Sequence, residues 1–131
     1  GGCLSRLTAL LGTPQAPVTE GTILFLEDTR EWPYRIDRLL TQARQAGLFD
    51  RVAGVVLGTF ETCPPHNQVN ALDIIRDEFA DAAFPVGFGL QAGHSAAERG
   101  VEQTALPLGV RVRFDADAGL LTALESPLEP A

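Results

Sequence analysis

The stretch Gly21–Tyr34 has the sequence GTILFLEDTREWPY and holds the strongest structural signal in the chain. Four apolar residues, Ile23–Leu26, run directly into the acidic residues Glu27, Asp28 and Glu31. A short, uninterrupted apolar run is typical of a strand buried on both faces of a parallel sheet. Carboxylates at the C-terminal end of such a strand lie where open α/β sheets bind their ligands. Two interpretations follow: the acids form part of a site, or they only cap the next helix.

Apolar periodicity on both sides of this stretch predicts alternating helices and strands. A helix comes first, and a β-α-β-α-β order follows it. The predicted helices are 3–11, 34–46 and 72–79, and the predicted strands are 22–27, 53–57 and 84–88. Strands that alternate with helices in this way favour a small parallel sheet with crossover helices.

The last third of the chain has a different pattern, which predicts short strands at 103–106, 110–114 and 120–124. Val110, Val112 and Phe114 alternate with Arg111 and Arg113, as in a half-exposed antiparallel strand. We therefore predict an α/β fold in which an antiparallel β layer packs on the small parallel sheet. A length of 131 residues is typical of one domain, residues 1–131.

Composition limits the partners that we expect. A net charge of −7 argues against a nucleic-acid partner, because binding to phosphates needs an excess of Lys and Arg. No apolar run approaches the roughly 20 residues that span a bilayer, so we expect no membrane segment. The first residues lack the basic and small-residue pattern of a signal peptide. Met is absent even from position 1, which predicts a fragment or an excised domain.

His94 is the stronger of two histidine candidates. It lies in the sequence AGHS directly after the third predicted strand of the sheet. If the strands are parallel, His94 reaches the same sheet edge as Glu27. A Glu and a His at one edge are the orienting acid and the general base of a nucleophilic triad. The alternative is a surface-loop histidine, and His66, next to two prolines, is interpreted as a plain loop residue.

A nucleophile is harder to find. Ser5, Ser95 and Ser126 are the only serines, and none lies in a G-x-S-x-G elbow. Cys3 stands at the start of a predicted helix, where a thiolate is favoured, but no partner is placed for it. Cys3 and Cys63 could be free thiols or one bridge. We therefore expect any catalytic nucleophile to belong to a segment outside this sequence.

Signals for a metal or a cofactor are weak. His66, His94 and the scattered carboxylates do not form a metal-ligand spacing such as H-E-x-x-H. The glycines around Gly89 do not form a phosphate loop, and the chain has no Lys to serve one. We expect neither a metal ion nor a nucleotide cofactor.

Seven short segments, taken in order, resemble the C-terminal domain of the LD-carboxypeptidases. This serine peptidase family is also called the murein tetrapeptide carboxypeptidases and includes the microcin C immunity proteins. The family's G-G-N-L resembles the start of this chain, with Cys3 in place of its Asn. The matching segments are Gly1–Leu4, Leu11–Pro14, Ile23–Asp28, Tyr34–Leu39, Ala53–Phe60, Gly93–His94 and Leu106–Gly109.

The resemblance implies a two-domain hydrolase whose N-terminal domain carries the nucleophilic Ser. Its C-terminal domain, of the swivelling β/β/α type, supplies a Glu and a His, which are Glu27 and His94 here. The reaction would release the terminal D-Ala of a cytoplasmic muropeptide during recycling. The expected partners are this substrate and the protein's own N-terminal domain. Without that domain we expect the chain to be inactive, with an exposed apolar face that could form a homodimer.

Two alternatives remain open. An immunity-type relative would hydrolyse a peptidyl or aminoacyl nucleotide amide, although the run Leu26–Asp28 looks more like the murein branch. A non-catalytic module would use the cleft only to hold peptides, which the presence of both Glu27 and His94 disfavours. With Glu27 assigned to the triad, Asp28 and Glu31 are expected to support or cap, and Trp32–Tyr34 to pack or to line the cleft.

Overall fold

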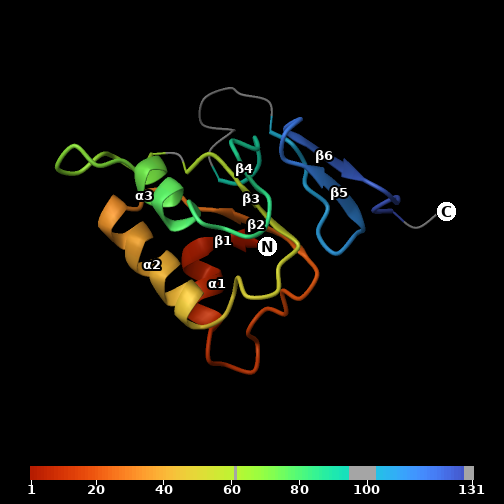
Figure 1. Ribbon diagram of the computed structural model, residues 1–131, viewed down its shortest axis with the longest axis horizontal. Helices are drawn as coiled ribbons and strands as arrows, with labels where there is room; N and C mark the ends of the chain where they lie inside the picture. Colours follow the sequence, from red (N-terminus) through yellow and green to blue (C-terminus); the bar gives the residue numbers. More distant parts are fainter. Residues whose placement is uncertain (61, 95–102, 129–131) are drawn as a thin grey trace.

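The apolar run after Gly21 forms the second strand of a four-stranded parallel sheet, as Figure 1 shows for the computed structural model. Residues 1–60, 62–94 and 103–128 are described. The sheet order is β1-β2-β3-β4, and every neighbouring pair is parallel. Its strands are β1 (Gly2–Cys3), β2 (Ile23–Glu27), β3 (Gly54–Leu57) and β4 (Val86–Phe88). The predicted parallel sheet is confirmed, whereas the two-residue β1, too short to leave a sequence pattern, was not predicted.

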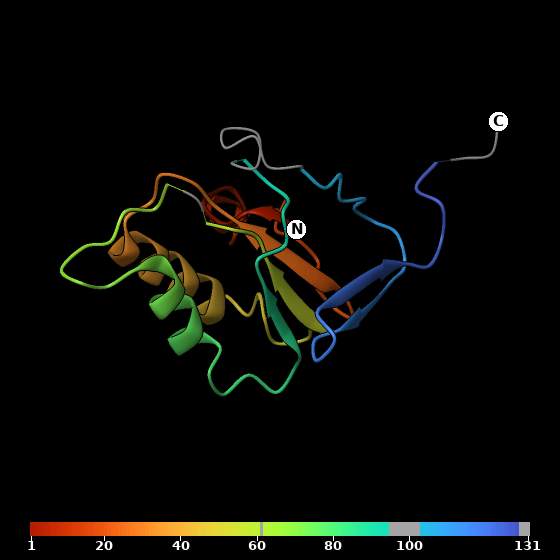
Figure 2. The same cartoon turned by 90° about the horizontal axis from the view of Figure 1, so that it is seen from above.

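Three helices cover one face of this sheet (Figure 2). They are α1 (Leu4–Leu10), α2 (Pro33–Gln45) and α3 (Ala71–Glu78). Alternate residues of β2 point to opposite faces, so Leu24 and Leu26 pack against the helices. Ile36 and Leu40 of α2 are fully buried there. This helix-covered face holds the main hydrophobic core.

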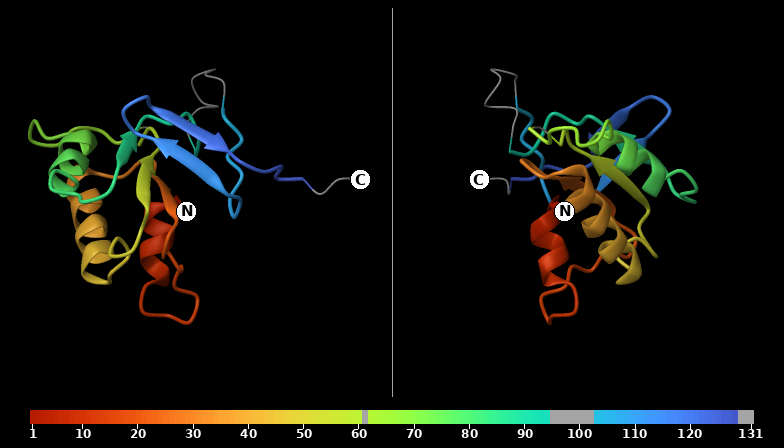
Figure 3. Two further views of the ribbon diagram at one scale, coloured as in Figure 1. Left: turned by 45° about the vertical axis from the view of Figure 1, so that its right-hand side comes forward. Right: turned by 90° about the vertical axis from the view of Figure 1, so that its left-hand side faces the viewer.

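The opposite face of the sheet carries a smaller core under a hairpin (Figure 3). The hairpin consists of β5 (Val112–Asp115) and β6 (Leu120–Ala123), which pair antiparallel in a sheet of their own. Phe25 and Val56 are buried on this face, with Phe114 and Leu121 of the hairpin half-buried against them. The predicted antiparallel layer is confirmed.

The predicted strand at 103–106 is wrong. These residues belong to no strand, and the chain there makes one inter-segment backbone hydrogen bond, from Thr104 N to Gln91 O at 2.7 Å. Pro107 follows directly and lacks the N–H that a ladder needs. Leu106 instead packs its side chain into the smaller core. Its apolar character reflects this anchoring contact.

We predict that the hairpin opens independently of the main core. No hairpin side chain is fully buried, and its strands bond only to each other. Amides of β5 should therefore exchange with solvent at a lower opening free energy than amides of β3. Leu40→Ala leaves a cavity at a fully buried site, so it should lower the opening free energy of the β3 amides by about 2–5 kcal/mol. Native-state hydrogen exchange by NMR measures both, and equal opening free energies for β3 and β5 would contradict this division.

Candidate active site

Glu27 and His94 meet at one edge of the parallel sheet. Glu27 is the last residue of β2, and His94 follows β4 after a short loop. Because β2, β3 and β4 are parallel, their C-terminal ends share this edge. The Glu27 side chain is 6% exposed and the His94 side chain 56%. The carboxylate is thus buried beneath an imidazole that faces solvent.

Three hydrogen bonds join these two residues across 67 positions of sequence. His94 Nδ1 lies 2.9 Å from Glu27 Oε1 and 3.0 Å from Oε2. The backbone N–H of His94 also donates to Oε2, at 3.2 Å. Both oxygens of the buried carboxylate are therefore satisfied, as burial of a charge requires.

The geometry decides which nitrogen of His94 is available. A carboxylate only accepts hydrogen bonds, so Nδ1 must carry the proton in its contact with Glu27. In the neutral ring Nε2 then has the free lone pair. An imidazole held in this tautomer, with Nε2 open to solvent, can accept a proton from a group that approaches from outside.

Two glycines make room for the Glu27 side chain. Gly93 has a φ of +110°, and a Cβ built on it would lie 2.7 Å from Glu27 Oε2. A Cβ on Gly58 would lie 2.8 Å from the Cβ of Glu27. Both distances are below what real side chains tolerate, so larger residues at either position would displace the carboxylate. Because Gly93 has no side chain, the backbone of the loop before His94 can lie close to the Glu27 carboxylate.

Asp28 caps a helix, but not the one that follows it in sequence. It is buried, and its Oδ2 accepts from the backbone N–H of Ser5 at 2.9 Å, in the first turn of α1. Its Oδ1 accepts from the Thr29 N–H at 2.9 Å and from the Cys3 thiol at 3.5 Å. The interpretation that Asp28 caps the next helix is therefore wrong: α2 begins after Trp32 with no side-chain cap, and Asp28 caps α1 instead. Asp28 ties the end of β2 to α1.

Residues 1–114 match the family described as the LD-carboxypeptidase C-terminal domain. The chain belongs to this family. A Streptomyces coelicolor protein, provisionally named a carboxypeptidase, is 42% identical over 93% of this chain and 37% of its own length. The murein tetrapeptide carboxypeptidase of Pseudomonas aeruginosa is 34% identical over 87% of this chain and 38% of that protein.

Solved structures agree with the sequence relatives. The microcin C7 self-immunity protein in its wild-type apo state matches with a TM-score of 0.81 and 26% identity, over 98% of this chain and 38% of that one. This LD-carboxypeptidase domain therefore spans less than two fifths of the length of each protein named here.

The described part of the LD-carboxypeptidase domain places no nucleophile at His94. Ser5 Oγ lies 3.2 Å from the Cys3 thiol, and Ser126 Oγ donates to Leu128 O near the C-terminus. The Cys3 thiol donates to the Asp28 carboxylate at 3.5 Å. Ser95 lies outside the described residues. The structure thus gives Cys3 a structural contact instead of the reactive environment that a thiol nucleophile needs.

The structure also describes the surroundings of Cys63 and Glu31, two further residues named from the sequence. Cys63 is a free thiol, like Cys3, and burial raises its pKa, which makes it a poor nucleophile at neutral pH. Glu31 bonds to Arg35 one turn further along, including a contact of 3.3 Å from Arg35 Nη2 to Glu31 Oε1. Within the described residues, no group of three or more His, Cys, Asp or Glu side chains is placed to hold a metal ion.

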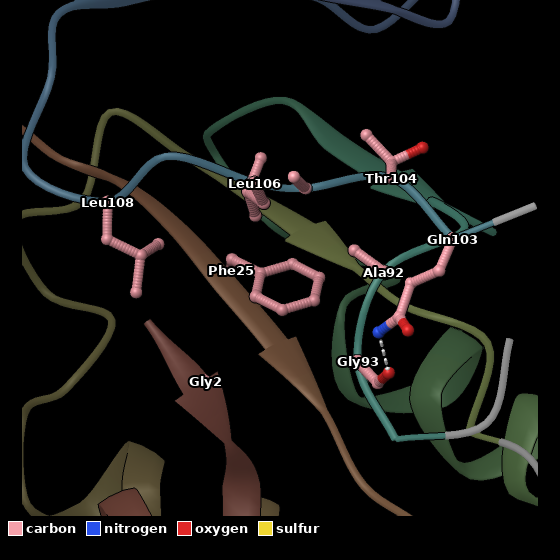
Figure 4. Close-up of a pocket in the computed structure, with 9 residues that line it drawn as sticks. Gly2, Phe25, Ala92, Gly93, Gln103, Thr104, Leu106 and Leu108 are labelled. Carbon is pink, nitrogen blue, oxygen red and sulfur yellow. Dashed lines mark hydrogen bonds between the residues drawn. The ribbon is translucent and has the colours of Figure 1, made fainter. Parts of the chain in front are cut away.

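A hollow of about 450 Å³, which sequence reasoning missed, is lined in part by Gly93, the residue before His94 (Figure 4). Phe25 lines the hollow together with residues 103–106, where Gln103 Nε2 donates to Gly93 O. Residues 103–106 are the segment for which the sequence predicts a strand. The signal that could have revealed the hollow is Leu106-Pro107, an apolar anchor followed by a residue that ends strand pairing.

We predict that Asp28→Ala destabilises the domain by about 1–3 kcal/mol, because the Ser5 N–H at the start of α1 loses its acceptor. Urea unfolding followed by circular dichroism measures the loss. The control is Asp117→Ala, an exposed carboxylate beside the β5–β6 turn, which should change stability by no more than about 0.5 kcal/mol. Equal losses in the two variants would contradict a capping role for Asp28.

Proposed function

We propose that this chain is the C-terminal domain of a serine LD-carboxypeptidase that removes the terminal D-Ala from murein tetrapeptides. Glu27 and His94 supply two members of a Ser-Glu-His triad. The observation that carries the proposal is the pairing of Glu27 with His94 Nδ1, at 2.9 and 3.0 Å, with the imidazole exposed. The third member, a Ser, belongs to a preceding domain that is not part of this sequence.

The proposed reaction uses His94 twice. Nε2 takes the proton of the Ser hydroxyl as the oxygen attacks the peptide carbonyl, and then returns a proton to the leaving amine of D-Ala. The acyl-enzyme is released by a water that His94 activates in the same way. Glu27 holds Nδ1–H and stabilises the imidazolium that forms in each step. Its burial strengthens this stabilisation, because the local dielectric is low.

The relatives support murein as the substrate class. The Pseudomonas aeruginosa murein enzyme is 34% identical to this chain over 120 residues, against 29% over 120 residues for the microcin C7 self-immunity protein of Escherichia coli. A second candidate function is the hydrolysis of a peptidyl or aminoacyl nucleotide amide. The structural match to the microcin immunity protein, with a TM-score of 0.81, supports it. A peptide-binding module without catalysis would have no use for the Glu27–His94 pair.

The proposed partners follow from the missing nucleophile. The preceding domain must approach the exposed side of His94, and the substrate is a muropeptide of the cytoplasm. Exposed apolar side chains would be covered in the longer protein, and in this chain alone they could form a homodimer. They include Val18, Leu108 and Leu120, which are 85%, 59% and 58% exposed. No helix among the described residues is long and apolar enough to cross a membrane.

We predict that this chain, extended by the upstream domain of the Streptomyces coelicolor relative, releases D-Ala from a murein tetrapeptide. Glu27→Gln should lower kcat by about 10⁴, because the amide selects the wrong tautomer. His94→Ala should cost about 10⁴–10⁶. Glu20→Gln, an exposed carboxylate paired with Arg51, is the control and should keep the parent rate.

D-Ala is quantified by a coupled amino-acid oxidase assay. An active parent whose Glu27 and His94 variants keep its rate would overturn the site assignment. Release from a peptidyl nucleotide amide, but not from the tetrapeptide, would favour the immunity-type function.

A further inference from the structure

The chain's single Trp and single Tyr lie together on the surface, around one of its two histidines. Trp32 is 41% exposed and Tyr34 is 49% exposed. Both contact the ring of His66 edge to face, with centroid distances of 5.6 Å and 6.0 Å. Large aromatic rings left half-exposed in contact with one another form a platform on which a ligand can pack. We call Trp32, Tyr34 and His66 the aromatic platform.

A tight turn holds His66 in this position. His66 and Val69 exchange backbone hydrogen bonds of 2.9 and 3.0 Å, and between them Asn67 and Gln68 have φ values of +50° and +67°. Two successive left-handed residues are the mark of a type I′ turn. The loop is also tied to the segment after β2, because Thr62 Oγ1 lies 2.9 Å from Thr29 Oγ1. His66 is thus presented to Trp32 by a constrained loop.

Backbone strain gathers in the same two loops. Among the described residues, the non-glycine residues with positive φ are Arg30, Phe60, Thr62, Asn67 and Gln68. Each costs roughly 1–3 kcal/mol, and such residues cluster at ligand sites. Thr62 is β-branched, so its φ of +51° is the least expected of them. Strained loops and exposed rings are two independent observations that point to the same place.

The platform lies at the same edge of the sheet as the proposed catalytic pair. Trp32 lies in the loop after β2, Tyr34 in the first turn of α2 and His66 in the loop after β3. Glu27 ends β2. Trp32 is five residues after Glu27, so their Cα atoms are at most about 18 Å apart. A ligand bound at both places therefore bridges no more than about 18 Å between these two Cα atoms.

A muropeptide has the required length and chemistry. Three residues precede its scissile bond and extend about 10 Å. The γ-linked glutamate and the lactyl ether add several bonds more before the amino sugar begins. A pyranose ring has an apolar C–H face that packs on an aromatic ring, while its hydroxyl and N-acetyl groups stay in water. Arg38 lies over the Tyr34 ring, 5.3 Å from its centroid, and adds donors beside the platform.

We propose that the aromatic platform binds the N-acetylated amino sugar of a muropeptide whose peptide end reaches His94. This inference rests on the proposed function and deepens it by naming the sugar-bearing form as the preferred substrate. The platform requires the sugar, whereas the Glu27–His94 pair requires only the peptide.

Trp32 is the natural probe, because it is the chain's only tryptophan. Titration of this chain with a disaccharide tetrapeptide should give a saturable change in its fluorescence. Sugar-free tetrapeptide should give none at the same concentrations. Tyr34→Ala and His66→Ala should each weaken binding by about tenfold, as expected for an aromatic contact. Leu120→Ala, an exposed apolar residue of the hairpin, is the control and should bind as the parent does.

Equal responses to the two peptides, or no response to either, would overturn the proposal. A response to adenosine monophosphate alone would also overturn it, by assigning the platform to a nucleobase. Circular dichroism spectra that match the parent's would show that Tyr34→Ala and His66→Ala remain folded.

Turnover by the extended protein separates this inference from the proposed function. The two platform variants should raise KM for the disaccharide tetrapeptide about tenfold, leave kcat unchanged, and leave the sugar-free reaction unchanged. Sugar binding without any D-Ala release would refute the carboxypeptidase function alone. D-Ala release with no difference between the two substrates would refute the platform alone.

Discussion

The contact between Glu27 and His94 Nδ1 is the interaction on which the proposed function depends. A carboxylate that is only 6% exposed is stable as a charge only when its oxygens are paired, and His94 supplies all of the hydrogen bonds that Glu27 accepts among the described residues. Leaving a buried carboxylate without its hydrogen-bond partner costs about 1–3 kcal/mol or more. The same contact that stabilises the burial therefore fixes the tautomer of the imidazole. Glu27 and His94 therefore contribute both to the stability of the fold and to the proposed reactivity.

The sheet makes this contact possible over a separation of 67 residues. Parallel strands deliver their C-terminal ends to one edge, and the helix-covered core fixes β2 and β3 in register. Asp28 then anchors the end of β2 to α1, and the glycine at 93 lets the His94 loop approach. These constraints are satisfied within the chain. In the proposed function, a preceding domain supplies the nucleophile and covers the exposed apolar residues.

The features predictable from sequence are those with local causes. The apolar run of β2, the stripe of α2 and the alternation in β5 each follow from where a side chain is buried, and each was predicted. The prediction of a strand at 103–106 was wrong. Over so few residues, an apolar side chain that packs into the core and one in a paired strand leave similar sequence patterns. The contact of His66 with Trp32 is not predictable from the sequence, because it depends on how two loops fold together. Asp28 capped the preceding helix because the β1–β2 pairing, invisible in the sequence, brings α1 alongside.

The most direct test of the account is the protonation of His94 in this chain at neutral pH. Nitrogen NMR of ¹⁵N-histidine-labelled protein distinguishes a protonated ring nitrogen from one with a free lone pair. The account predicts that neutral His94 has its proton on Nδ1, coupled to Glu27, and that Glu27→Gln abolishes this preference. A neutral His94 with its proton on Nε2, or a spectrum unchanged by Glu27→Gln, would contradict the claim that Glu27 orients His94 as a base.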